Sequence, residues 1–119
     1  MRTITWWSMV SLFAGGLAAA AETGSAPAGN IERGKQVYSH QLCQACHGTI
    51  GQGGGVAGPK IAPNPFPWPA FEHQVRKPRA AMPPYTVKNL SDQDLADIYA
   101  YVASIKPGPG AKDIPLLNQ

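Results

Sequence analysis

The sequence has little charge and very few cysteines. Cysteine occurs twice in 119 residues, so a zinc site built from cysteines would lack two of its ligands. Charged residues make up 14% of the chain, and its formal net charge is only +3. A charge this small does not indicate strong nucleic-acid binding. The sequence therefore gives no reason to expect a nucleic-acid partner.

Long apolar runs are also missing, apart from one near the N-terminus. Arg2 precedes a short apolar stretch that ends in four consecutive alanines. This order predicts a secretory signal peptide over residues 1–21. The stretch is shorter than the roughly 20 residues that span a bilayer, and Gly15-Gly16 interrupts it. A retained membrane anchor is the alternative, but we expect no stable membrane insertion after the signal is removed.

The most informative segment is the pentapeptide Cys43-Gln44-Ala45-Cys46-His47. Cys-x-x-Cys-His is the attachment signature of a covalently bound c-type haem. On one helical turn the two cysteines face the same side, where both thiols can bond the haem vinyl groups. His47 then meets the iron as its proximal ligand. We therefore expect one haem c, attached through Cys43 and Cys46.

Two other kinds of site use a Cys-x-x-Cys pair. Zinc would need two further ligands at suitable spacing, and the chain has no other cysteine. A thioredoxin-like redox pair would need a βαβ pattern around it. Here the pair lies in a short helical stretch followed by a glycine-rich loop. His47 and the export signal both favour haem over these alternatives.

Apolar spacing predicts an all-α fold with three helices separated by long loops. The first begins after Asn30 as N-cap and continues into the haem motif, and the second covers Pro69 to Lys77, with Phe71 and Val75 on one face. The third follows Leu90, starts with a capping-box-like Ser91 and Asp94, and ends at Lys106 and Pro107. The first helix repeats apolar or small residues at Ile31, Gly34, Val37, Tyr38 and Leu42. The third carries a stripe of Leu95, Ile98, Tyr99, Val102 and Ile105.

The domain boundaries follow from these helices. Residues 22–30 are small and polar and are expected to form a flexible lead, and residues 31–106 form the domain. Residues 48–69 are expected to form a loop folded around the haem, because glycine and proline are frequent there. Residues 107–119 are a tail rich in proline and glycine, for which both a packed and an extended path stay open.

The domain left after signal removal has a thin apolar core. It holds just under a hundred residues, and much of the hydrophobic composition leaves with residues 1–21. Small domains bury too little surface to be very stable. A buried haem would supply much of the missing apolar centre. We therefore expect the protein without haem to be poorly folded.

With this motif, a helix before it, a glycine-rich loop after it and an amphipathic last helix, the chain resembles the class I cytochromes c over about residues 31–105. The resemblance implies that the first and last helices cross near the haem. A glycine and an aromatic residue of the first helix then meet an aromatic residue of the last, and Gly34, Tyr38 and Tyr99 match those roles. It also implies that a Gly-Pro carbonyl binds the outer nitrogen of the proximal histidine. Gly58-Pro59 stands where this pair is expected.

The resemblance also implies a methionine as the sixth iron ligand. The segment Ala80-Ala81-Met82-Pro83-Pro84-Tyr85 fits the small-Met-Pro setting of that ligand. Methionine is often core filler, but a position between proline-rich turns is poor for a residue packed on a helix. We therefore expect Met82 to bind the iron opposite His47. His40 and His73 are the rival ligands, and each is expected to be a solvent-exposed residue instead.

Further residues lie in segments that can approach the haem propionates, where N–H and O–H donors are needed. They are Trp68, Arg76, Arg79 and Tyr85. We expect these four residues and Pro59 to contact the cofactor. The proline-rich run of residues 63–69 departs from the general family pattern, so the path of the loop stays open there.

The expected function follows from the coordination. If His47 and Met82 both bind iron, no position is open for a substrate, so the protein is expected to transfer single electrons and not to be an enzyme. A thioether ligand raises the reduction potential. We expect a periplasmic carrier whose redox partners are a dehydrogenase, a terminal oxidase or another cytochrome. The alternatives are a cytochrome subunit of an exported dehydrogenase, and a haem enzyme or gas sensor with an open sixth position.

Basic residues surround Met82 in the sequence. They are Arg76, Lys77, Arg79 and Lys88. Such a group is either ordinary solvated surface or a basic rim that steers an acidic partner toward the haem.

Overall fold

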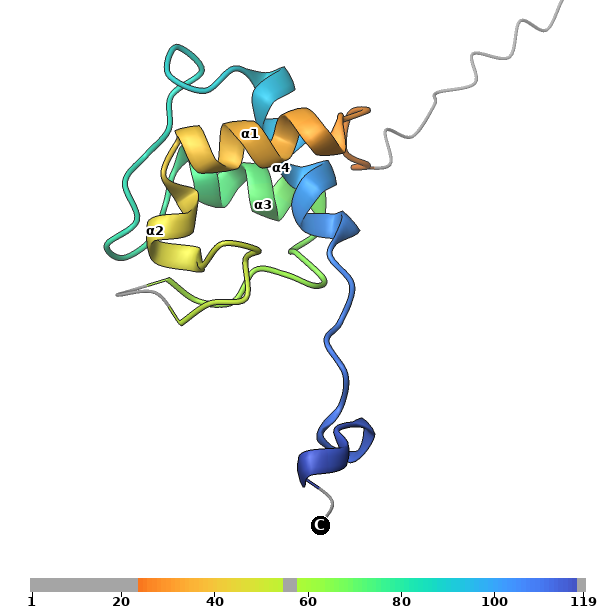
Figure 1. Cartoon of the computed structure of the whole chain (residues 1–119). Helices are drawn as coiled ribbons and strands as arrows, with labels where there is room; N and C mark the ends of the chain where they lie inside the picture. The colour runs from red at the N-terminus through yellow and green to blue at the C-terminus, as the bar shows by residue number, and fades with distance from the viewer. Residues whose placement is uncertain (1–23, 55–57, 118–119) are drawn as a thin grey trace, which may run out of the picture.

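The computed structural model describes residues 24–54 and 58–117 (Figure 1). The expected signal peptide lies outside the described residues. The main elements are α1 (Ile31–His40), α2 (Cys43–His47), α3 (Trp68–Arg76) and α4 (Asp92–Ser104). Two short 3-10 turns follow, η1 (Ala111–Asp113) and η2 (Pro115–Leu117). The described ranges contain no strand, and the all-α prediction is confirmed.

The start of α1 agrees with the predicted cap. The Asn30 side chain accepts a hydrogen bond from the Arg33 backbone N–H at 2.9 Å, which satisfies one of the free donors at the helix start. The continuous run into the haem motif was wrong, because Leu42 has a φ of 60° and interrupts the helix before α2. Its side chain is 66% exposed, so Leu42 does not belong to the apolar stripe that we expected for the first helix. A left-handed residue turns the chain, so helical spacing no longer applies beyond His40.

The other two helices also agree closely with their predicted positions. Pro69 lies in the first turn of α3, where its missing N–H costs nothing, and both Phe71 and Val75 are buried. At the start of α4 the Ser91 side chain accepts a hydrogen bond from the Asp94 N–H at 3.1 Å. The apolar stripe is also confirmed at its buried positions, which are Leu95, Ile98 and Val102.

Helices α1 and α4 cross at a very short distance (Figure 1). A Cβ atom at Gly34 would overlap the backbone carbonyl oxygen of Asp97, so glycine is required at this contact. One turn further along both helices, the rings of Tyr38 and Tyr101 lie 5.6 Å apart. Tyr99, which we expected at this place, packs instead against Phe71 of α3, with ring centroids 5.0 Å apart. The expectation was wrong by half a turn, since the residue one turn beyond Asp97 is Tyr101.

The crossing also buries a carboxylate. Asp97 is 1% exposed, and its Oδ1 accepts hydrogen bonds from the Asn30 N–H at 2.7 Å and from Gln93 Nε2 at 2.9 Å. The Arg33 Nε lies 2.9 Å from the other carboxylate oxygen. A buried carboxylate persists only when paired and hydrogen-bonded. Asp97 therefore ties the start of α1 to the middle of α4.

Part of the expected lead contacts the domain. Gln93 of α4 donates a hydrogen bond to the Ala28 carbonyl at 3.0 Å, and Ala26 packs against the hydrophobic core. The packed structure therefore begins before Ile31, within the segment that we expected to be a flexible lead.

The tail takes the extended path of the two that the sequence left open. Figure 1 shows the chain after α4 leading away from the helices and ending in η1 and η2. Leu116 and Leu117 are 78% and 64% exposed. Over the described residues, no helix has the length and apolarity that crossing a membrane requires.

Arg33 also pairs with Asp94, and this pair predicts a pH dependence. The hydrogen bond from Arg33 lowers the pKa of the Asp94 carboxyl. A lowered pKa stabilises the fold above the unfolded value of about 3.9, and the stabilisation is lost as the pH falls through the folded value. We expect Arg33→Met to flatten the fall of the unfolding free energy below about pH 4. Chemical denaturation at a series of pH values measures this.

Lys88→Met is the matched control for that experiment, because it also removes one exposed cation but lies outside the α1–α4 contact. It should leave the fall of the unfolding free energy at low pH unchanged. If both variants flattened this fall equally, the total charge of the protein, and not the pair with Asp94, would determine the loss of stability in acid.

Candidate haem site

The two cysteines lie on the single helical turn α2. Both are free thiols; Cys43 is half-buried and Cys46 is exposed. Burial raises the pKa of the Cys43 thiol to about 11. Redox Cys-x-x-Cys pairs need a thiol with a lowered pKa, so this environment does not suit a thioredoxin-like pair.

His47 is oriented by a backbone carbonyl. Its Nδ1 lies 2.8 Å from the Pro59 carbonyl oxygen, and because a carbonyl can only accept, Nδ1 must carry the proton. The lone pair of Nε2 is then available for a metal. A Cβ at Gly58 would overlap the Cys46 carbonyl group, so glycine lets the loop come close enough to form this bond. The hydrogen bond suggested by the Gly-Pro pattern is therefore present.

Two tyrosines hold the backbone that follows His47. The Tyr38 hydroxyl donates to the Gly48 carbonyl at 2.7 Å, and the Tyr101 hydroxyl donates to the Thr49 carbonyl at 3.2 Å. Burial raises the pKa of both phenols, so both remain donors at neutral pH. The two tyrosines that meet at the crossing of α1 and α4 therefore also hold the backbone directly after the expected proximal histidine. Sequence reasoning missed this role.

Met82 lies on the loop between α3 and α4. It is half-buried and packs against the hydrophobic core, as Cys43 does. The Gln74 side-chain N–H lies 3.9 Å from its sulfur. A thioether sulfur is a weak acceptor, so this is a weak polar contact. Gln74 had no signal in the sequence, since its position on α3 becomes meaningful only when the loop folds back.

Two of the residues expected at the propionates bind protein groups instead. The single hydroxyl proton of Tyr85 is donated to the Gln41 carbonyl at 2.9 Å. Arg76 Nη1 donates to the Tyr85 and Leu90 carbonyls at 3.0 and 2.7 Å, and its Nη2 pairs with Asp92 at 2.7 Å. Both side chains therefore brace the loop that carries Met82.

The other two expected contacts have different environments. Trp68 is buried, and its ring lies edge-on to Tyr99 with centroids 5.4 Å apart. Arg79 is exposed and lines a shallow pocket beside Phe66 and Gln74. Trp68 thus contributes mainly to the core, and Arg79 remains available to a propionate.

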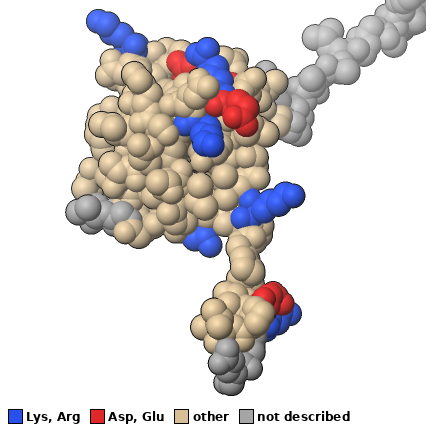
Figure 2. All heavy atoms as spheres, in the orientation of Figure 1, with Lys and Arg blue, Asp and Glu red and all other residues tan. Residues whose placement is uncertain are grey.

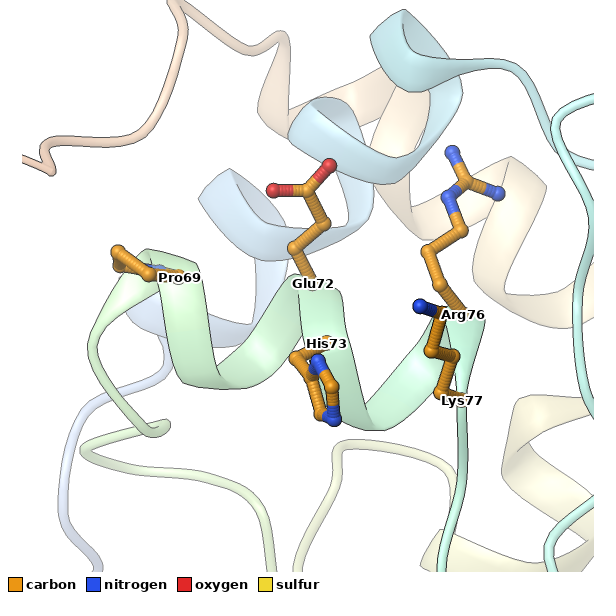
Figure 3. A pocket seen from close by; sticks show the side chains of 5 residues that line it. All are labelled: Pro69, Glu72, His73, Arg76 and Lys77. Carbon is orange, nitrogen blue, oxygen red and sulfur yellow. The ribbon is translucent and has the colours of Figure 1, made fainter.

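A second shallow pocket lies on the outer side of α3. Its lining consists of Pro69, Glu72, His73, Arg76 and Lys77. Figure 3 shows Glu72 and Arg76 pointing to one side of the helix and His73 to the other. Neither cysteine lines this pocket, and His73, like His40, is exposed. The rival histidines therefore lie at the surface.

The donor set fits a covalently bound haem. Two thiols lie one turn apart, an imidazole has its Nε2 available, and a thioether lies among apolar side chains next to the core. These are the attachment groups and the nitrogen and sulfur ligands that c-type haem uses. Over the described residues, no cluster of three or more His, Cys, Asp or Glu side chains could hold a metal ion.

Comparison with known proteins agrees with this reading. A family profile described as "Cytochrome C oxidase, cbb3-type, subunit III" matches residues 29–102. Cytochrome c-555 of Methylococcus capsulatus is 31% identical over 94 residues, which cover 76% of either chain. Cytochrome c4 of Pseudomonas aeruginosa is 37% identical over 81 residues, 66% of this chain and 40% of that protein. No solved structure gives a significant match. The chain therefore belongs to the class I c-type cytochromes, which transfer electrons through a covalently bound haem.

Proposed function

We propose that this protein is an exported, periplasmic electron carrier with one haem c, whose iron has His47 and Met82 as axial ligands. The observation that carries the proposal is the position of Met82. It is half-buried against the core that Cys43 also contacts, on a loop anchored to α3 through Tyr85. A thioether held there would be available to the iron of a haem bound through Cys43 and Cys46.

Each residue of the site then has a stated task. Cys43 and Cys46 would hold the haem, Pro59 orients the imidazole of His47 that would bind the iron, and Met82 would supply the sixth ligand. When bound, the haem supplies a one-electron Fe(III)/Fe(II) couple, whose potential the axial ligands tune over about 0.8 V. The soft sulfur of Met82 favours Fe(II), which raises the potential. No iron position is left for a substrate, so the proposed protein is a carrier and not an enzyme.

The redox partner is proposed to be a dehydrogenase, a terminal oxidase or another cytochrome. Lys77, Arg79 and Lys88 are exposed and lie close to Met82 in the sequence, which supports an acidic docking surface on that partner. Figure 2 shows blue side chains spread over the visible face with uncharged surface between them. Because the charges are dispersed, we expect steering of the encounter and not a tight complex.

The tail supports a second form of this function. Leu116 and Leu117 are exposed at the end of an extended segment that leads away from the domain (Figure 1). Exposed apolar groups of this kind mark interaction sites. They favour a cytochrome subunit bound to an exported dehydrogenase, and a catalytic chain that co-purifies with the full-length protein would identify this form.

The ligation by Met82 is tested by Met82→Ala in the holoprotein. We expect the oxidised wild type to show the weak far-red sulfur-to-iron band and the variant to lack it. The variant's potential should fall, and its ferrous form should bind carbon monoxide, because the sixth position is open. Absorption spectra and a redox titration measure these changes.

Val87→Ala is the matched control, since it removes a largely exposed apolar side chain from the same region. It should keep the band and the potential of the wild type. A wild type that lacks the band and binds carbon monoxide readily would refute the proposed ligation. A haem enzyme or gas sensor would then be the better reading.

A further inference from the structure

The loop that carries Met82 is anchored to α3 at its base. We define the Met82 loop as residues 77–85. Its last residue, Tyr85, donates its backbone N–H to the Val75 carbonyl at 3.1 Å. The Tyr85 carbonyl accepts a hydrogen bond from Arg76 Nη1 at 3.0 Å. Both ends of the loop are therefore fixed to the same end of α3.

The Tyr85 side chain joins this loop to the haem-attachment segment. Its hydroxyl donates to the Gln41 carbonyl at 2.9 Å, across 44 positions of sequence. Gln41 lies two residues before Cys43, at the turn where Leu42 adopts its left-handed conformation. The phenol ring is half-buried and packs against the hydrophobic core, as Met82 and Cys43 also do. One hydrogen bond thus connects the segment of the proposed sixth ligand with the segment that carries the first cysteine.

We propose that the Tyr85 hydroxyl is a latch that holds the Met82 loop closed, and thereby limits access of external ligands to the sixth iron position. This inference rests on the proposed ligation by Met82. An external ligand must displace the methionine, and its apparent affinity falls with the small fraction of molecules in which the loop is open. A hydrogen bond that forms only in the closed state lowers that fraction.

Tyr85 is a positioning residue and can be tested without dismantling the loop. Replacement by phenylalanine keeps the ring on the core and keeps both backbone bonds to α3. Arg76 is less suitable for a test, because it also binds the Leu90 carbonyl and Asp92 at the start of α4. Its removal would disturb a second element.

The experiment is a titration of the ferric holoprotein with imidazole, followed by the change in haem absorption on imidazole binding, which can be read with or without Met82. A net hydrogen bond changes an equilibrium by about fivefold. We therefore expect Tyr85→Phe to lower the apparent Kd for imidazole about fivefold.

Ser104→Ala is the control, because it also removes one hydroxyl-to-carbonyl bond, to the Tyr101 carbonyl at the end of α4. Its apparent Kd for imidazole should stay within about twofold of the wild type.

A second comparison separates a latch from a general loosening of the fold. In the Met82→Ala background the sixth position is already open, so adding Tyr85→Phe should leave the Kd for imidazole unchanged. The latch is overturned if Tyr85→Phe alone leaves the Kd within twofold of the wild type, or if Ser104→Ala shifts it equally. A wild type without the sulfur-to-iron band would overturn the proposed ligation itself, and that result is visible before any imidazole is added.

Discussion

The double variant Cys43→Ala/Cys46→Ala is expected to lose covalent haem completely and to lose most of its helical structure. Without the two thiols no thioether bond can form. The buried apolar side chains of the described residues come mainly from α3 and α4. A core this small supplies little stability unless a further apolar group fills it. Haem staining after denaturing electrophoresis and far-ultraviolet circular dichroism measure the two effects.

Gln44→Ala is the matched control, since it changes the same turn but spares both thiols and His47. It should retain the haem stain and the helical spectrum. If the double variant kept a native spectrum and a sharp unfolding transition, the apolar core would be sufficient by itself. The domain would then fold without haem, and the haem would not be needed to complete its core.

The second large effect is expected at the crossing of α1 and α4. In Gly34→Ala the added methyl group would overlap the Asp97 carbonyl oxygen, so the helices must move apart. Overpacking of this kind costs about 1–3 kcal/mol. We expect the upper end of that range, because the same contact aligns Tyr38 with Tyr101 and the buried Asp97 with its hydrogen-bond partners. Guanidinium denaturation of the holoprotein measures the change.

Gly108→Ala provides the control for that measurement. Gly108 lies in the tail, and a Cβ atom there would meet nothing within 4 Å. The guanidinium denaturation midpoint of the Gly108→Ala variant should equal that of the wild type. Equal midpoints for both alanine variants would show that the two helices can separate at no cost, contrary to the close approach at Gly34.

Features that depend on neighbours in the chain were predicted well. Asn30 and Ser91 cap their helices through N–H groups three residues ahead, and such contacts need no other element. The haem motif is local for the same reason, since its spacing within one turn already brings both cysteines to one side. The apolar stripe of α4 is a property of its own periodicity.

Features that depend on two distant elements were missed or misassigned. No local pattern marks Asp97 as a buried residue, yet the crossing with α1 buries it and pairs it with Arg33. Tyr99 and Tyr101 are both aromatic residues of α4, and only the angular position of the crossing decides which of them meets Tyr38. Local spacing contains no information about that angle.

The same distinction applies to the site. The sequence by itself determined the attachment motif, because the chemistry of that short pattern follows from its spacing. The roles of the Gly-Pro pair and of Met82 came from the resemblance to the family. Only the tertiary structure decided that Arg76 and Tyr85 brace the Met82 loop. The direction of a long polar side chain depends on which acceptors the fold brings near it. Those acceptors belong to segments far away in the sequence, and packing alone brings them together.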